Sequence, residues 1–589
     1  MNNKLFPIGL TTGYKWLAQS LKGRYIWSVP LLFMLERGNY SDKKLRLIFY
    51  SLWVLLSVAQ ASFSNLIPDE AYYWAYSQRM AWGYFDHPPV IAAMIRAGYA
   101  MINNEAGVRL LCIPAMAVTI YITEKLTRPR NISQFYMAIS SLAILHIAGI
   151  LAVPDVPLLL FGACFFSLYK KYSDNGKAHT IPLLALSIAL MLLSKYHGIL
   201  IVFFTLLSNR QLLRKGSFWL IVALSIALFL PHVFWQAEHG YPSINYHLSG
   251  RNTLAYNISY TLDYLGTIPA VFAPAAGIVM LYFALRRKTV NEAEKAMSYV
   301  LWGTLLFFLL MSFRGRIEGN WILYLVIPVV CLGYPELEQK KWAPKFIRLS
   351  FIISISLIFI ARTFLLDGAW NINTDFSRWK EWAATVKAEA NGKPVAFMNS
   401  YQKAAEYEFY TGEKSFTLNN VMGRKDQYGI WNYENEVQGK DILLVSNFDV
   451  DSLGTLETVK GKLRILHIYN FRSSSNIEII PGTKKLLTTP GDTMDINFAM
   501  RVKEGSTIDA EANSGYPMKL SYQFFNGEGL VSHTVTEHRI SNSELGSGNI
   551  SGLRIPAPAE KGDYELLISV SSGWLPPSIS GGKIRVIVH

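Results

Sequence analysis

Residues 67–94, IPDEAYYWAYSQRMAWGYFDHPPVIAAM, hold side chains that could perform acid–base chemistry. Asp69 and Glu70 are adjacent carboxylates, and Asp86 stands beside His87 after a run of aromatic residues. A positioned carboxylate can accept the proton of a reacting hydroxyl. A histidine is charged for part of the time near neutral pH. The segment is therefore a candidate catalytic site.

The same segment also has a purely structural interpretation. Pro68 followed by two acids is typical of a helix start, where negative charge suits the helix dipole. Asp86 could cap the helix predicted for VIAAMIRAGYAM. The aromatic side chains could form a belt at a membrane surface. Those aromatic residues are Tyr72, Tyr73, Trp74, Tyr76 and Trp82.

Other charged residues occur in loops that we predict to lie on the same side of a membrane. They are Asp155 in VPDVP, Lys195 in SKYHG, His247 and Arg251 in HLSGR, and Arg314, Arg316 and Glu318 in FRGRIEGNW. Lys195 alone could be a lysine at a helix end that reaches the interface, and Arg251 alone a solvated loop residue. Together, carboxylates and cations above an apolar body predict binding of a phosphate attached to a lipid.

The composition requires a membrane to hold these loops. Hydrophobic residues make up 51% of the 589 residues, and charged residues only 17%, against about 25% in soluble proteins. We expect about eleven transmembrane helices, in the apolar segments near 46–66, 108–126, 133–152, 156–170, 179–194, 197–208, 217–235, 264–285, 298–313, 321–336 and 347–365. Lysine and arginine gather in alternate loops, which places those loops and the basic segment 1–44 in the cytoplasm.

The chain becomes polar after the last apolar segment. KPVAFMNSY and KDILLVSNF read as buried strands beside helical stretches, which predicts an α/β domain at 371–482. Short alternating strands punctuated by Gly, Ser, Asn and Pro predict a β-sandwich at 485–589. No metal-ligand spacing, P-loop or nucleophile elbow occurs there, so both parts read as docking or binding modules outside the membrane.

The membrane part, residues 45–366, resembles a known class. Asp-Glu, then Tyr-Phe-Asp-His-Pro-Pro, then Pro-Asp-x-Pro-Leu in PDVPLLLF resembles the GT-C glycosyltransferases that use polyprenyl-phosphate sugars. The stretches SKYHGILIVF and PHVFWQAEHGYPS are similar to the same set. It includes protein mannosyltransferases, lipid A aminoarabinose transferases and bacterial proteins similar to glycosyltransferase family 39. The resemblance implies a GT-C fold over about residues 45–365.

The resemblance also implies residue roles. Asp69 matches the catalytic carboxylate, with Glu70 beside it, and Asp86 and Asp155 lie near the acceptor or a divalent metal, for which Asp155 is the candidate ligand. His87 stands where the aminoarabinose transferases have a phosphate-binding lysine, since their Glu-Lys-Pro-Pro is Asp-His-Pro-Pro here. Binding of the donor phosphate would therefore depend more on Lys195, on Arg251 or on a metal ion.

The implied function is transfer of a sugar from a polyprenyl phosphate, such as undecaprenyl phosphate, with inversion. The acceptor would be lipid A, a polysaccharide or a protein outside the bacterial inner membrane, and nucleic acid is not expected as a partner. A transporter or flippase for a lipid-linked sugar is the main alternative, although its polar residues should lie at mid-membrane. A non-enzymatic envelope scaffold is the second alternative.

Overall fold

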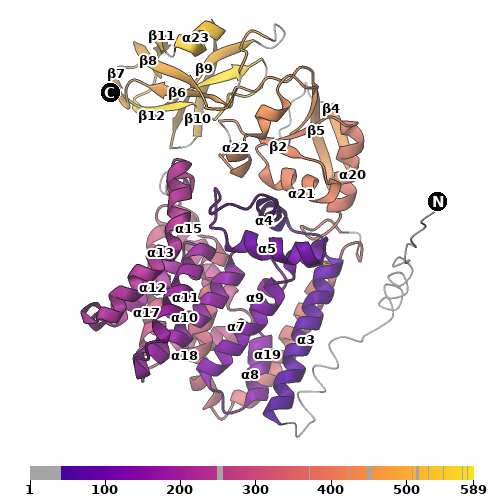
Figure 1. Ribbon diagram of the computed structural model, residues 1–589, viewed down its shortest axis with the longest axis vertical. Coiled ribbons are helices and arrows are strands. Elements are labelled where there is room, and N and C mark those ends of the chain that lie inside the picture. Colours follow the sequence, from indigo (N-terminus) through magenta and orange to yellow (C-terminus); the bar gives the residue numbers. More distant parts are fainter. Residues whose placement is uncertain are drawn as a thin grey trace, which may run out of the picture.

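A bundle of apolar helices forms one end of the molecule and two β-containing parts form the other (Figure 1). This computed structural model describes residues 41–247, 256–370, 372–421, 423–446, 454–506, 508–512, 517–527, 529–547, 549–573, 575–579 and 581–589. Most of the predicted basic segment 1–44, and Arg251, lie outside the described residues.

Six helical stretches among the described residues are long and apolar enough to cross a membrane. They are α3 (Asp42–Phe63), α6 with α7 (Glu105–Arg109 and Cys112–Thr127), α13 (Gly216–Glu238), α17 (Glu292–Ser312), η3 with α18 (Gly319–Leu325 and Val326–Glu338) and α19 (Ala343–Phe364). A seventh would be α15 (Ile258–Val271) with α16 (Ala275–Arg286). The predicted count of eleven is therefore not confirmed.

The remaining predicted spans contain shorter or more polar helices. These are α8 (Ile132–Ser140), α9 (Ala143–Ala148), α10 (Asp155–Asn175), α11 (Thr180–Ser194) and α12 (Gly198–Ser208). Two apolar segments expected to be single helices are broken. Segment 133–152 contains both α8 and α9, and α15 and α16 are bent by 107°. Pro274 lies at the second break, where its missing N–H cannot continue a helix.

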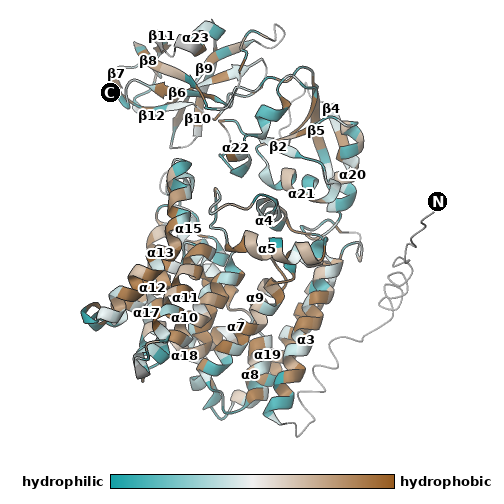
Figure 2. Ribbon diagram, in the orientation of Figure 1, coloured by the Kyte–Doolittle hydropathy of each residue, from teal (hydrophilic) through white to brown (hydrophobic). Residues whose placement is uncertain are grey.

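The outer faces of the bundle are apolar (Figure 2). In α13, only 17% of the most apolar window is buried, and Leu224, Ile226 and Leu228 are exposed. Large apolar faces of this kind are unfavourable in water but suit contact with hydrocarbon chains. The protein is therefore a multi-pass membrane protein.

Two helices lie across one end of the bundle instead of running along it (Figure 1). They are α4 (Pro68–Gln78) and α5 (Val90–Met101). Pro68 opens α4, and Asp69 and Glu70 occupy its first turn, so the predicted helix start is confirmed. The predicted cap of α5 is wrong, because Pro89 holds the N-cap position and no side chain caps the helix.

The α/β part packs on α4 through α21. Its elements are α20 (Trp379–Ala390), β1 (Val395–Met398), α21 (Tyr401–Thr411), β2 (Ser415–Leu418), α22 (Gln427–Trp431), η4 (Tyr433–Val437), β3 (Ile442–Ser446), β4 (Gly454–Thr458) and β5 (Gly461–Ile468). The strand order is β2-β1-β3-β5-β4, and β1 pairs in parallel with both β2 and β3. The carboxyl ends of β1 and β2 consequently meet at one edge of the sheet.

The last part contains two sheets that enclose a separate apolar core. Their strands are β6 (Ile477–Pro481), β7 (Lys485–Thr488), β8 (Thr493–Val502), β9 (Met518–Asn526), β10 (Gly529–Arg539), β11 (Asn549–Pro556), β12 (Gly562–Ser572) and β13 (Gly582–Val588). A short helix, α23 (Asn542–Ser547), precedes β11. Alternate residues of β8 are buried, as expected for a strand with one face on a core.

Candidate active site

Glu70 is fixed in a buried ion pair. Its two carboxylate oxygens accept from Arg109 Nε at 2.8 Å and from Arg109 Nη2 at 2.5 Å. The backbone N–H of Ala152 also donates to it at 2.8 Å. Arg109 donates further to backbone carbonyls around the end of α3. Glu70 thus joins α3, α4, α6 and the loop that leads to Asp155, which suits positioning better than proton transfer.

Asp69, one residue earlier, has a different environment. It is partly exposed, and among the described residues it accepts one hydrogen bond, from Gln402 Nε2 at 2.8 Å. Burial raises the pKa of Asp69, and the nearby carboxylates Asp86 and Glu70 raise it further, against the effects of Gln402 and Arg424. A carboxylate with a raised pKa is a stronger proton acceptor.

Asp86 lies between the membrane part and the α/β part. Its Oδ1 accepts from Arg424 Nη1 at 2.6 Å, and its Oδ2 accepts from the Tyr76 hydroxyl at 3.3 Å. The negative charge of Asp86 holds the pKa of the Arg424 guanidinium above its usual range despite burial. Asp86 therefore organises this junction, which explains why it does not cap α5.

The Arg424 guanidinium is surrounded by aromatic rings. Its central carbon lies 4.5 Å from the Tyr401 ring centroid, 5.0 Å from that of Tyr246 and 5.8 Å from that of Phe85. Arginine over aromatic faces gains cation–π attraction that strengthens as water is excluded. These contacts hold the guanidinium in one place next to Asp86.

Asp155 and Lys195 form a second buried pair. Lys195 Nζ donates to Asp155 Oδ1 at 2.8 Å, and both side chains are at most 5% exposed. Asn320 Nδ2 donates to the other carboxylate oxygen at 3.4 Å. Asp155 is the first residue of α10, where negative charge suits the helix dipole. The predicted metal-vicinity acid and the predicted phosphate-binding lysine are thus each other's partners.

His87 lies beside the Tyr73 ring, with 5.5 Å between the ring centroids. Burial, with a contribution from the positive charge of Lys195, lowers the pKa of His87 to about 3. Its imidazole is therefore neutral near pH 7. Its Nδ1 is buried with no hydrogen-bond partner among the described residues.

Three of the segments predicted to share one side of the membrane contact one another or α13: the segment between α4 and α5, the SKYHG loop and the segment after α13. The Tyr196 hydroxyl lies 3.0 Å from His232 Nε2, and His232 Nδ1 lies 2.7 Å from the backbone oxygen of Trp82. Ser243 Oγ donates to the backbone oxygen of Phe85 at 2.8 Å. Side chains from α13 and from the loops around 196 and 243 therefore hold the segment between α4 and α5.

The described residues offer no cluster of side chains that would ligate a metal ion. They contain no group of three or more His, Cys, Asp or Glu side chains arranged to hold an ion. Asp155, the candidate ligand, has its carboxylate occupied by Lys195 and Asn320. The donor set described here does not fit a resident metal.

The sequence interpretation missed the contribution of the α/β part. Gln402 follows β1 and Arg424 follows β2, and the carboxyl ends of parallel strands are where open α/β sheets bind ligands. The position of Gln402 and Arg424 after these strands was therefore the sequence signal that could have identified them. The predicted aromatic belt is also wrong for most of its members, since Tyr72 and Tyr76 are buried and Tyr72 packs on Tyr401 at 4.2 Å. Trp82 remains 58% exposed.

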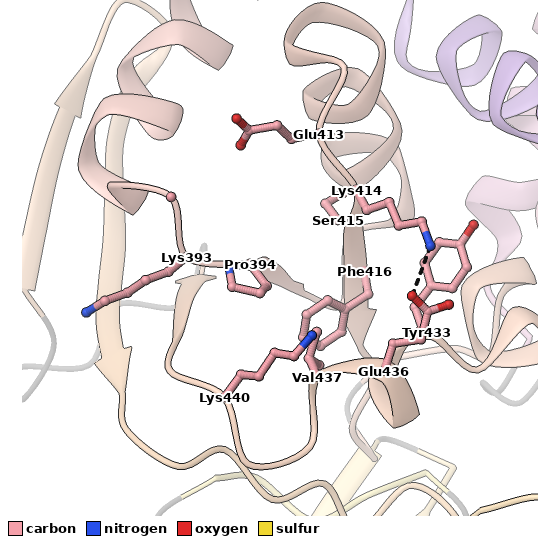
Figure 3. A pocket seen from close by; sticks show the side chains of 11 residues that line it. Lys393, Pro394, Glu413, Lys414, Ser415, Phe416, Tyr433, Glu436, Val437 and Lys440 are labelled. Atoms are coloured by element: carbon pink, nitrogen blue, oxygen red, sulfur yellow. Dashed lines mark hydrogen bonds and ion pairs between the residues drawn. The ribbon is translucent and has the colours of Figure 1, made fainter.

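The opposite edge of the same sheet carries a shallow pocket of about 280 Å³ (Figure 3). Lys414 and Glu436 form an exposed ion pair there, with 2.9 Å between Nζ and Oε2. The pocket residues either precede β1, β2 and β3 or, as Ser415 and Phe416 do, begin β2, so they lie at the amino ends of the strands. Its lining residue Tyr433 stacks on Arg79, which caps the carboxyl end of α4, whereas Asp69 and Glu70 lie in the first turn of that helix.

Comparisons with known proteins agree with the resemblance. Residues 86–235 match the dolichyl-phosphate-mannose-protein mannosyltransferase family. Lipid A galacturonosyltransferase RgtD from Rhizobium johnstonii is 24% identical over 334 residues, which cover 53% of this chain and 68% of that protein. Two crystal structures of ArnT from Cupriavidus metallidurans share the fold.

The apo ArnT structure has a TM-score of 0.56, and the undecaprenyl phosphate complex has a TM-score of 0.55. Each is 12% identical and covers 72% of this chain and 98% of ArnT. At this identity the likeness shows the fold. Together with the family match, it confirms the predicted resemblance to the GT-C glycosyltransferases.

Proposed function

We propose that this protein of the GT-C glycosyltransferase class transfers a sugar from a polyprenyl phosphate to an acceptor outside the bacterial inner membrane. RgtD is named for action on lipid A, and ArnT has been crystallised with undecaprenyl phosphate. Undecaprenyl phosphate is therefore the proposed carrier, and lipid A is the first acceptor to test. The outward orientation of α4 and of both C-terminal parts belongs to this proposal.

The contrast between Asp69 and Glu70 carries the proposal. Both carboxylate oxygens of Glu70 accept hydrogen bonds, from Arg109 and from the backbone N–H of Ala152. Asp69, by contrast, is partly exposed, and its pKa is raised. Asp69 is the proposed general base. Glu70, given as catalytic by resemblance, is proposed to position the first turn of α4.

The reaction is a single displacement. Asp69 accepts the proton of an acceptor hydroxyl while that oxygen forms a bond to the anomeric carbon. The bond between the anomeric carbon and the phosphate oxygen breaks, and its electron pair stays on the leaving polyprenyl phosphate. One displacement inverts the configuration. Positioned base catalysis of this kind contributes roughly 10²–10⁴-fold.

The leaving phosphate needs hydrogen-bond donors. Lys195 has an ammonium group with three donors, of which one reaches Asp155. Neutral His87 has a buried Nδ1 with no hydrogen-bond partner among the described residues, and it would be a donor in the Nδ1–H tautomer. Arg251 stays a proposed phosphate ligand on sequence grounds, since it lies outside the described residues. Donors aimed at developing charge are often the largest catalytic contribution.

Lipid mass spectrometry tests this function in cells that lack the protein. They are complemented with wild type or with Asp69→Asn at matched membrane levels. We expect the deletion and the variant to accumulate one polyprenyl-phosphate sugar that wild type consumes, which also identifies the donor. If Asp69→Asn clears that lipid as well as wild type does, Asp69 is only a helix-start residue and the proposal fails.

A further inference from the structure

Two side chains of the α/β part contact the two acids of the proposed site. Gln402, in the first turn of α21, donates to Asp69 Oδ1 at 2.8 Å. Arg424, in the loop between β2 and α22, donates to Asp86 Oδ1 at 2.6 Å. More than 330 residues of sequence separate the members of each pair. The pairs therefore exist only because the α/β part is docked on α4.

The sheet topology explains why these side chains arrive together. β1 and β2 are parallel neighbours, with Met398 paired to Leu418 at their carboxyl ends. The chain leaves both strands at the same edge and continues to Gln402 and Arg424. This is the edge where open α/β sheets place their ligand sites. Here that edge is turned onto the membrane part.

The loop that carries Arg424 is held from two further sides. The backbone N–H of Asn420 donates to Asn399 Oδ1 at 2.9 Å, and Asn399 Nδ2 donates to Asn420 Oδ1 at 2.9 Å. The backbone N–H of Val421 donates to the carbonyl of Pro577, in the last part of the chain, at 3.0 Å. An isolated antiparallel bridge joins Asn420 and Ser578. The β-sandwich thus supports the same loop.

We propose that the α/β part completes the catalytic centre with two positioning residues. Gln402 orients Asp69 and stabilises its ionised form, and Arg424 fixes Asp86 beside it. This role rests on the proposed function, in which Asp69 accepts the proton of the acceptor hydroxyl during sugar transfer. Under this proposal the α/β part is a component of the catalytic centre and not only a docking module.

The first test uses the pH dependence of sugar transfer by purified full-length protein. Gln402→Leu removes a hydrogen bond that favours ionised Asp69. We expect the acid limb of kcat to move by about one pH unit to higher pH, with most of the rate recovered above it. Gln402→Glu keeps the shape but adds a negative charge, so its limb should move at least as far. A uniform loss at every pH, with the limb unmoved, overturns the role of Gln402.

The second test is a double-mutant cycle on kcat with Asp86→Asn and Arg424→Gln. A displaced catalytic group costs about 10²-fold, so each single variant should lose activity on that order. The double variant should be no slower than the slower single variant, because both changes break one contact. If the two losses multiply, the residues act independently and Arg424 does not work through Asp86.

Lys414→Ala is the matched control. Lys414 is a cation of the same part with a carboxylate partner, Glu436, but at the other edge of the sheet (Figure 3). Its kcat and acid limb should equal those of wild type. Asp69→Asn separates the two proposals. If it transfers sugar normally, the proposed function has failed. If it is inactive while Gln402→Leu and Arg424→Gln match wild type, this inference alone has failed.

Discussion

The two edges of the α/β sheet are formed by the same strands but behave differently. At the carboxyl edge, the Arg424 and Asp86 side chains are 30% and 13% exposed and lie 2.6 Å apart. At the amino edge, Lys414 and Glu436 are 65% and 54% exposed and lie 2.9 Å apart. Water screens the second pair, and exposed pairs contribute little. Burial therefore distinguishes the pair that we propose to act in catalysis, since charge and distance are similar in both pairs.

The buried ion pair between Glu70 in α4 and Arg109 in α6 allows the same comparison within the membrane part. Glu70 and Arg109 are at most 2% exposed and satisfy one another and the nearby backbone. Removing one partner of a buried pair leaves the other charge unpaired, which is far more damaging than the loss of an exposed contact. The pairs can thus be ranked by burial, and the ranking can be tested.

The largest effect on stability is expected at Arg109. Arg109→Met should lower the free energy of unfolding by about 3–5 kcal/mol, because Glu70 is left buried and unpaired. Thermal denaturation of the detergent-purified protein measures the loss. Glu70→Gln combined with Arg109→Met should recover part of it, since no isolated charge remains. A single variant as stable as wild type would mean that water reaches Glu70.

Gly423 is the next position to change. A Cβ at this residue would lie 2.1 Å from Asn399 Oδ1, so Gly423→Ala must displace the Asn399–Asn420 contact. We expect a loss of about 1–3 kcal/mol in stability. Turnover should fall as Arg424 is displaced. Gly429→Ala is the control, because an added Cβ there would have no atom within 4 Å beyond its chain neighbours and its own helix backbone. Equal behaviour of the two variants would show that the loop tolerates movement.

The pH profile of wild type provides a milder test. Asp69 must be ionised to accept a proton, and burial raises its pKa. Turnover should therefore be high above this raised pKa and fall about tenfold per pH unit below it. The midpoint should lie above the ordinary range for aspartate. Steady-state kcat across pH measures it, and a midpoint at the ordinary aspartate value would contradict the burial of Asp69.

The smallest effect is expected at the amino edge. Glu436→Gln should change the free energy of unfolding by at most about 1 kcal/mol, because the pair with Lys414 is exposed. High salt should reduce even that difference. Thermal denaturation at low and high ionic strength checks this. A loss as large as that of Gly423→Ala would remove the distinction between the two edges.

Much of the local structure could be predicted from the sequence. The helix start at Pro68–Asp69–Glu70 and the strands β8, β9 and β12 follow from local preference and from periodicity in apolar residues. Pro274 marks where the helix breaks between α15 and α16, but the angle of the bend could not be predicted, because it depends on contacts with other helices. The aromatic residues of α4 were assigned to a membrane surface because their cover, α21, lies more than 300 residues away.

The sequence by itself determined that apolar helices, a segment with adjacent carboxylates and a GT-C resemblance occur in one chain. Composition, periodicity and motif order are properties of the sequence, and they can be read without knowledge of tertiary contacts. Only the tertiary structure decided what each charge does. It paired Glu70 with Arg109 and Lys195 with Asp155, and it brought Gln402 and Arg424 to Asp69 and Asp86. Burial and partner identity depend on which distant segments pack together, and for that reason the contacts of the proposed active site became visible only in the folded protein.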